Sequence, residues 1–580
     1  MRNRSVSISL NGATLILLAL LLVTFAAFLG QTLFNTKGEP REALVAVSML
    51  NQHNWILPES CGTDIPYKPP MLAWCIALLG WLNGGHVTEF LSRLPSALAA
   101  TAMLIAVFRF FAKRESAPLA MVTALVTATA FEVHRAATSC RVDMLLTAFI
   151  VTAILAMYSS WERHPRSSRR LPWLGILLMS GGVLTKGPVG MLLPCGTILV
   201  LRLMKGDSPL RAISQLFFAG GLALVLPALW YVAAYSQGGE QFLRLALEEN
   251  FGRFTGKMSY ESHEHTFLYN FQTLFAGLAP YTLLLLASLT AWKRYPRITL
   301  SASGIWQRLR SIPAERLLAV AAAVVIFVFY CIPKSKRSVY LLPMYPFLAF
   351  WIAVYIRWMV HNAPRVLRAY GIFMAAVGAL ASIAMLLIIT GIVQGPATGK
   401  IAVYFLEARS SGITALLTGS ICLAVSLGSL RVLIGGTPSS VVQWTLLDTL
   451  FIYWMFSAAI QPMALNPKSD RPMASDIETI VPEGEALYGF MTADMLRYYT
   501  AGFYLDDRIQ AVTSVPPAIE DSGWILAGDY DADSLKAILP QGTLLQPALE
   551  WPKKSCDNKQ LTTLYRYELP QEKAGNTGLP

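Results

Sequence analysis

The chain has 580 residues, of which 54% are hydrophobic and only 14% are charged. Apolar runs of roughly 17–25 residues recur along most of its length, and each is long enough to cross a bilayer as a helix. This composition excludes a soluble globular protein. The formal net charge is +12. Much of the basic excess lies in short loops, where Lys and Arg set the orientation of membrane helices, so we do not take it as a sign of nucleic-acid binding.

The hydropathy pattern predicts a polytopic α-helical membrane domain over residues 1–463, with about thirteen spans. The approximate span cores are 11–30, 93–110, 117–133, 143–160, 172–185, 188–204, 215–236, 267–291, 316–332, 338–357, 369–393, 412–430 and 442–463. Basic residues follow every second span, so the positive-inside rule assigns those loops and the N-terminus to the cytoplasm. We expect the first apolar run to be a retained helix rather than a cleaved signal peptide.

The first long external loop, 34–92, carries two dense polar motifs, Gly38–Glu42 and Tyr67–Pro70. Apolar residues at helical spacing lie between them over 43–50, and Pro40 suits the first position of a helix. We expect a short amphipathic helix in the membrane interface. Such a helix would hold charged groups at the membrane surface, where a lipid-linked anionic substrate would be handled.

Further charges on the same side are not required by the positive-inside rule. Asp143 opens the fourth span, Lys186 lies in a Gly-Pro turn between two spans, and Lys336 lies in a basic cluster that Tyr340 follows. The carboxylate can orient or activate a nucleophile, or it can simply favour the helix N-terminus. The cations suit a phosphate, or they extend to water as ordinary membrane-edge residues do.

A histidine pair, His263 and His265, precedes the eighth span within Glu261–Thr266. His-x-His with acids nearby is typical of divalent-metal binding, but two histidines supply no third fixed ligand. A divalent metal is therefore one option, and no other cofactor is predicted, because the sequence contains no P-loop and no dinucleotide-binding fingerprint.

The composition turns polar near residue 464, which predicts a separate α/β domain over 464–580 on the external side. Expected strands are 486–490, 509–512, 524–527 and 561–569, and expected helices are 493–501 and 533–539.

Taken as an ordered set, these motifs resemble the polytopic GT-C glycosyltransferases of the aminoarabinose transferase and protein O-mannosyltransferase superfamily. The matching segments are Gly38–Ala43, Tyr67–Pro70, Arg93–Ser96, Arg141–Met144, Leu184–Val189, Glu249–Phe254 with His263, and Ser335–Tyr340 with Leu342 and Pro343. The resemblance implies an inverting transferase in a bacterial inner membrane, with catalytic external loops 34–92 and 237–266. It implies a polyprenyl-phosphate-linked sugar as donor, and an envelope acceptor on the periplasmic side, either a lipid A-like glycolipid or a protein hydroxyl.

The resemblance also assigns roles to individual residues. The implied phosphate-binding residues are Arg41, Lys68, Lys186, Arg253, Lys336 and Tyr340. The acidic pair of the family reads Gly38-Glu39 here, so either Glu39 or Asp143 is the catalytic carboxylate. In the aminoarabinose branch an acid before the loop lysine helps a histidine to hold a metal. That position is Tyr67 here, which leaves His263 as the implied ligand.

Two other classes of function fit part of the pattern. A transporter or flippase of lipid-linked sugars would bind the same anion without chemistry, and would contain paired halves with broken helices; the sequence has no such repeat. A structural subunit of an envelope complex would not need charges gathered on one external face.

Overall fold

The computed structural model describes residues 9–164, 171–252, 264–294, 310–493, 496–512 and 519–570. The chain divides into two compact units. The helical unit contains Met1–Gln31, Tyr67–Leu72 and Phe90–Ala464, and the sheet unit contains Thr32–Pro66, Ala73–Glu89 and Leu465–Pro580.

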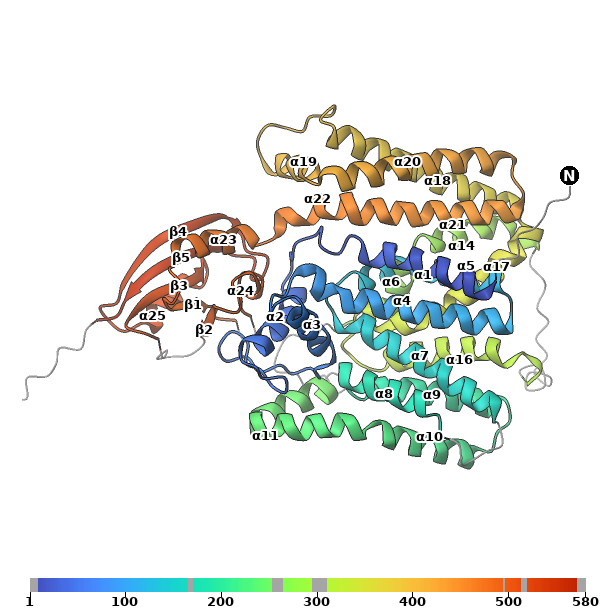
Figure 1. Ribbon diagram of the computed structural model, residues 1–580, viewed down its shortest axis with the longest axis horizontal. Helices are drawn as coiled ribbons and strands as arrows, with labels where there is room; N and C mark the ends of the chain where they lie inside the picture. Colours follow the sequence, from blue (N-terminus) through green and yellow to red (C-terminus); the bar gives the residue numbers. More distant parts are fainter. Residues whose placement is uncertain are drawn as a thin grey trace, which may run out of the picture. The chain divides into compact units, whose positions relative to one another are not determined.

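The helical unit is a bundle of long apolar helices with short connections (Figure 1). Its helices are α1 Leu10–Ala26, α4 Glu89–Arg114, α5 Ala117–Ala128, α6 Phe131–Ala137, α7 Val142–Arg163, α8 Trp173–Lys186, α9 Val189–Met204, α10 Pro209–Ala223, α11 Val225–Leu247, α13 Leu268–Gly277, α14 Tyr281–Ser288, α16 Ala314–Cys331, α17 Tyr345–Asn362, α18 Pro364–Ile389, α19 Lys400–Ser410, α20 Gly412–Gly435 and α21 Pro438–Met455. Short segments η1 Glu248–Gly252, η2 Leu289–Arg294 and η4 Ser338–Met344 lie between them. The unit ends with η5 Phe456–Ile460 and α22 Gln461–Leu465.

The helical membrane character that the sequence predicts is confirmed. Among the described residues, seven helices are long and apolar enough to cross a membrane, or up to nine if each of two bent helix pairs is one span. The bent pairs are α5 with α6, at 70°, and α13 with the segment Tyr281–Ala291, at 101°. Every expected span core falls on a helix, but α1, α8 and α9 have only 14–17 residues, so the count of thirteen stays a prediction.

The α8–α9 hairpin depends on two glycines. A Cβ atom added to Gly190 would lie 2.2 Å from the carbonyl carbon of Gly182 and 2.6 Å from the backbone nitrogen of Val183. The two helix backbones therefore touch, which only glycine allows. Between them, Gly187 has a φ of +79°, a value that suits glycine at a helix C-terminus. This local chemistry fixes the turn that holds Lys186.

The sheet unit is built around a five-stranded mixed sheet in the order β2-β1-β3-β5-β4. The strands are β1 Leu487–Phe490, β2 Gln510–Val512, β3 Ser522–Gly528, β4 Leu544–Lys554 and β5 Leu561–Glu568. β1 is parallel to β2 and β3, whereas β5 is antiparallel to β3 and β4. The remaining elements are α2 Gly38–Asn51, η6 Asn466–Lys468, α23 Arg471–Ile480, α24 Tyr499–Tyr504, α25 Ala532–Ile538 and most of α3 Met71–Leu82.

Alternating residues of the central strands supply two cores, one on each face of the sheet. Trp524 and Leu526 of β3 pack with residues of α23 and α24, and Ile525 and Ala527 pack with Leu535 of α25. Four of the strands match the expected positions. β4 was not expected, because Pro547 and Pro552 interrupt its sequence. It tolerates both because it is an edge strand that pairs only with β5.

The helix expected over 43–50 is longer and has a different environment. α2 begins at Gly38, so Pro40 is its third residue rather than its first. Its buried face packs against α24 within the sheet unit, and the side chain of Leu44 lies near Gly502. The apolar spacing that indicated an interfacial helix therefore reflects contact with α24.

Candidate active site

A buried ion pair joins the start of α7 to the end of α8. Nζ of Lys186 lies 2.5 Å from Oδ1 of Asp143, and the two side chains are only 17% and 11% exposed. Asp143 lies in the first turn of α7, where the helix dipole favours a carboxylate, and Lys186 is the last residue of α8, where it favours a cation. Residues 43 positions apart therefore meet in one charged contact.

Further cations surround this pair. Lys68 and Arg141 both act electrostatically on the Asp143 carboxylate, in addition to Lys186. Nζ of Lys186 also lies over the ring of Tyr340, 4.6 Å from its centroid, a cation–π contact. Three cations face one carboxylate, so the cluster has an excess of positive charge and can accept an anion.

A second ion pair, which sequence patterns did not indicate as part of the site, interacts with the cluster. Arg135 of α6 binds both carboxylate oxygens of Glu132, at 2.6 and 3.0 Å, and donates to Oγ of Ser338 at 3.3 Å. Arg135 also interacts electrostatically with Asp143. The three-residue spacing of Glu132 and Arg135 on a helix was the available signal.

The basic segment before η4 holds one cation in a buried position. Lys336 is 5% exposed, and within the described part of the chain its ammonium donates only to the carbonyl of Pro333. Nε of the neighbouring Arg337 is buried and has no hydrogen-bond partner among those residues. Buried cations normally have a charged partner, so this segment is suited to an anionic ligand.

The remaining predicted residues lie elsewhere. Glu39 is in the first turn of α2, and Arg41 forms an ion pair with Glu42 at 3.6 Å. Both belong to the sheet unit, so their part in the site stays a prediction. Arg253 and His263 lie outside the described residues, and their roles also stay predictions.

One three-residue group in the described part of the chain has the geometry to hold a metal. The ligand atoms of Asp470, Cys556 and Asp557, all buried in the sheet unit, lie within 4.8 Å of one another. They already have protein partners: Asp470 accepts from Ser555 at 2.6 Å, and Asp557 accepts from the Thr500 hydroxyl at 2.9 Å. This network explains the cluster as a hydrogen-bonded link between α24 and the β4–β5 turn.

Comparisons with known proteins bear on the helical unit. Residues 67–231 match the profile of the dolichyl-phosphate-mannose-protein mannosyltransferase family, a segment that includes Lys68, Asp143 and Lys186. Two similar curated proteins are undecaprenyl phosphate-alpha-4-amino-4-deoxy-L-arabinose arabinosyl transferases. The protein from Erwinia tasmaniensis is 25% identical over 62% of this chain and 63% of its own length. The protein from Edwardsiella ictaluri is 27% identical over the same shares. The chain thus spans less than two thirds of the length of these two relatives.

The fold extends further than the sequence similarity. The crystal structure of ArnT from Cupriavidus metallidurans bound to undecaprenyl phosphate superposes with a TM-score of 0.69, covering 96% of this chain and 98% of that one at 20% identity. That likeness establishes the fold, with a helical membrane unit and a C-terminal mixed sheet. The chain thus contains a segment, 67–231, that matches the dolichyl-phosphate-mannose-protein mannosyltransferase family, and its fold is similar to that of ArnT from Cupriavidus metallidurans.

Proposed function

We propose that the chain is an inverting glycosyltransferase that moves a sugar from a polyprenyl-phosphate donor to an acceptor in the cell envelope. The observation that carries this proposal is the buried Asp143–Lys186 pair with Lys68 and Arg141 in electrostatic range. A lipid phosphate fits a site with this excess of positive charge, and the Asp143 carboxylate holds Lys186 in a fixed position there.

The reaction is a single displacement. The acceptor oxygen attacks the anomeric carbon, the bond from that carbon to the phosphate oxygen breaks, and polyprenyl phosphate leaves with the bonding electrons. Negative charge therefore grows on the phosphate, where Lys186, Lys68 and Lys336 can donate charge-assisted hydrogen bonds. Donors fixed before the reaction need no reorganisation, and one such donor contributes about 10²–10³-fold in well-studied sites.

The two candidate carboxylates are Asp143 and Glu39. Asp143 is held by Lys186 at 2.5 Å and is surrounded by other cations, which makes it a weak proton acceptor and a good positioning group for Lys186. Glu39 is the remaining candidate to accept the proton of the acceptor. We therefore assign the base role to Glu39 and the positioning role to Asp143.

Transfer assays with purified variants test these assignments. With a labelled polyprenyl-phosphate sugar, Glu39→Gln is expected to lower kcat by about 10²–10⁴-fold, the range for a general base, and to remove the acidic limb of the pH–rate profile. Asp143→Asn is expected to weaken donor binding as well as turnover. An unchanged pH profile in Glu39→Gln would remove it from the base role, and full transfer by Asp143→Asn and Lys186→Ala would refute the site.

The names of the relatives narrow the choice of donor sugar and acceptor. Two relatives are named for transfer of 4-amino-4-deoxy-L-arabinose from undecaprenyl phosphate, and the family profile is named for mannose transfer to protein. A lipid A-like glycolipid and a protein hydroxyl are the corresponding acceptors. Mass spectrometry of envelope lipids and glycoproteins from a deletion strain would distinguish them.

We also propose a topology of the chain in the membrane. The site lies on the periplasmic side of a bacterial inner membrane with about thirteen spans, a cytoplasmic N-terminus and a periplasmic C-terminal domain. Labelling of single introduced cysteines with a membrane-impermeant reagent would test it. A cytoplasmic position for residue 530 would contradict it.

One observation favours the alternative of a transporter or flippase. Two helix pairs are sharply bent, α5 with α6 and α13 with the segment Tyr281–Ala291. Broken helices are typical of transporter binding sites. Proteoliposomes separate the two functions, because a flippase would move a fluorescent lipid-linked sugar between leaflets without any acceptor. Transfer without such movement supports the enzyme.

A further inference from the structure

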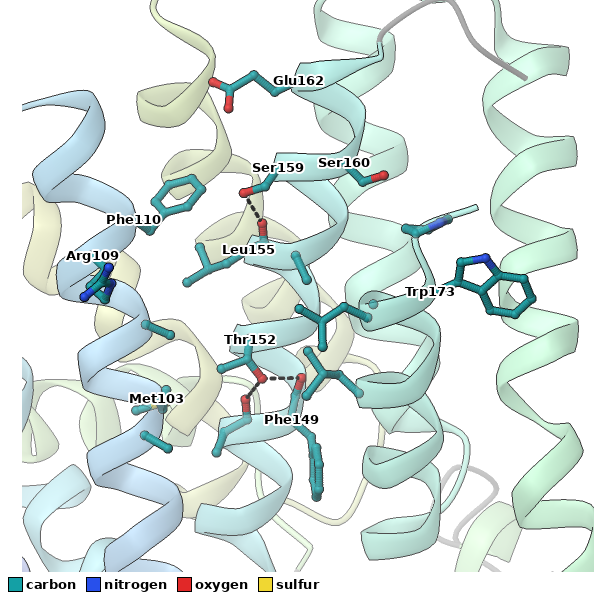
Figure 2. A pocket seen from close by; sticks show the side chains of 18 of the residues that line it. Met103, Arg109, Phe110, Phe149, Thr152, Leu155, Ser159, Ser160, Glu162 and Trp173 are labelled. Carbon is teal, nitrogen blue, oxygen red and sulfur yellow. Dashed lines mark hydrogen bonds between the residues drawn. The ribbon is translucent and has the colours of Figure 1, made fainter. Parts of the chain in front are cut away.

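A groove of about 890 Å³ runs along the helical unit between α4, α7 and the start of α8 (Figure 2). Most of its lining is apolar. Small residues leave the space open, namely Ala102 and Ala106 on α4 and Ala148 and Ala156 on α7. The groove therefore has the character of a binding site for hydrocarbon chains.

The groove is separate from the candidate active site. Leu145, Thr152 and Ser159 line it, and their spacing of seven residues puts them on one face of α7. Asp143 precedes Leu145 by two residues, which is a rotation of about 200° around the helix. Asp143 thus points to the opposite side of α7, and a donor held at Lys186 would not occupy this groove.

The mouth of the groove, at the C-terminal ends of α4 and α7, is basic. Its lining contains the four basic residues Arg109, Lys113, Arg114 and Arg163 and the single acid Glu162. Arg114 is paired with Glu162, and Arg163 donates to the carbonyl of Ser159 at 3.0 Å. The lining therefore carries an excess of three positive charges.

Two of these cations have no protein partner in the described residues. Lys113 is exposed and Arg109 is half-buried, and neither has a hydrogen bond or ion pair with a described residue. Arg109 lies five residues before the end of α4, about 7.5 Å along the helix axis. A charged side chain within a membrane helix is costly unless it is paired or reaches water. None of the described residues pairs with Arg109, so an anionic ligand is a suitable partner for it.

We infer that this groove binds one anionic glycerophospholipid. Its phosphate lies between Arg109 and Lys113, and its acyl chains lie along the alanine-lined floor. The phosphate supplies the partner that both cations lack, and the acyl chains fill the apolar volume. Trp173, at the rim and 64% exposed, suits the headgroup region, where tryptophan is enriched. A zwitterionic lipid is disfavoured because its own cation would face a basic mouth. The inference does not depend on sugar transfer.

Native mass spectrometry of the purified full-length chain tests this inference. The protein is titrated in detergent micelles with phosphatidylglycerol or phosphatidylcholine. We expect one phosphatidylglycerol to bind at least about tenfold more tightly than phosphatidylcholine, about 1.4 kcal/mol, because both lipids offer a phosphate but only phosphatidylcholine brings a cation to the basic mouth. Arg109→Gln and Lys113→Gln should each remove most of that preference. Ala106→Leu with Ala156→Leu should lower the occupancy of both lipids, because the added side chains fill the groove.

The matched control is Arg431→Gln, which removes an exposed cation near the end of α20, outside the groove, and should bind phosphatidylglycerol as the unaltered chain does. Lys113 is exposed, so its variant keeps the test valid if Arg109→Gln fails to fold. Equal binding of the two lipids would overturn the inference, as would an unchanged preference in both Gln variants. Displacement of phosphatidylglycerol by an equal amount of polyprenyl phosphate would assign the groove to that lipid and also overturn it.

Discussion

Replacing Lys186 with a residue that lacks the ammonium group tests the proposed site most directly. Lys186 and Asp143 are in contact at 2.5 Å and are both largely buried, so Lys186→Gln leaves a buried carboxylate without its main partner. Breaking a buried pair from one side costs about 3–5 kcal/mol. Because Lys68 and Arg141 also act on Asp143, we expect the lower end of that range. The double variant Lys186→Gln/Asp143→Asn should lose less stability than the two single variants together.

The transfer activity of these variants should not follow their stability. The ammonium is proposed to stabilise charge on the leaving phosphate, so Lys186→Gln should lower kcat by about 10²–10³-fold, and the double variant should regain stability without regaining activity. Lys186→Arg, which keeps the charge, should retain part of the activity.

The assay measures transfer from a labelled polyprenyl-phosphate sugar, alongside thermal unfolding of each variant in detergent. Arg431→Gln, exposed and far along the sequence from both residues, is the control. A folded Lys186→Gln enzyme with at least half the turnover of the unaltered chain would refute the reasoning, as would additive losses of stability.

Three further outcomes are expected. Gly190→Ala should lower the unfolding temperature and the activity together, because its Cβ would overlap the Gly182 backbone at a cost of about 1–3 kcal/mol or more; equal stability would show that the hairpin can separate freely. Lys336→Met should raise the unfolding temperature, since it removes a buried cation, and should weaken donor binding about tenfold or more; tighter binding would contradict the phosphate role. Burial raises the pKa of Asp557 to about 7 from its ordinary 3.8. The folded chain therefore binds this proton more tightly, and the resulting stabilisation is present below about pH 4 and lost as the pH rises through 7. Calorimetry should detect a smaller loss of stability between pH 5 and pH 8 in Asp557→Asn than in the unaltered chain; an equal loss would exclude this group as the cause.

Local sequence patterns were sufficient where a single segment carries the whole signal. A run of apolar residues is a helix because a bilayer leaves no partner outside the helix for backbone N–H and C=O groups, and every expected span core falls on a helix. The turn at Gly187-Pro188 could be predicted from the sequence because glycine accepts the positive φ that ends α8. Strands β1, β3 and β5 could be predicted because their sequences are short apolar or alternating runs, and the burial of their side chains follows those runs.

Local sequence patterns did not predict the structure correctly where the packing partner of a segment decides it. The apolar face of α2 is the same whether it meets lipid or protein, and only the fold shows that it packs against α24. β4 contains two prolines, and its edge position in the sheet is what makes them acceptable. Glu132 was missed because its importance comes from Arg135 and, through Arg135, from Asp143.

The sequence by itself determined the apolar helices of the expected span cores and four of the five strands. It also supplied the charged residues from which the site is proposed, because hydropathy and turn chemistry act over a few neighbouring residues. Only the tertiary structure decided that Asp143 meets Lys186 across 43 residues, and that Asp143 and the basic groove occupy opposite faces of α7. Contacts between distant residues depend on how helices pack around one another, and no local pattern encodes that packing.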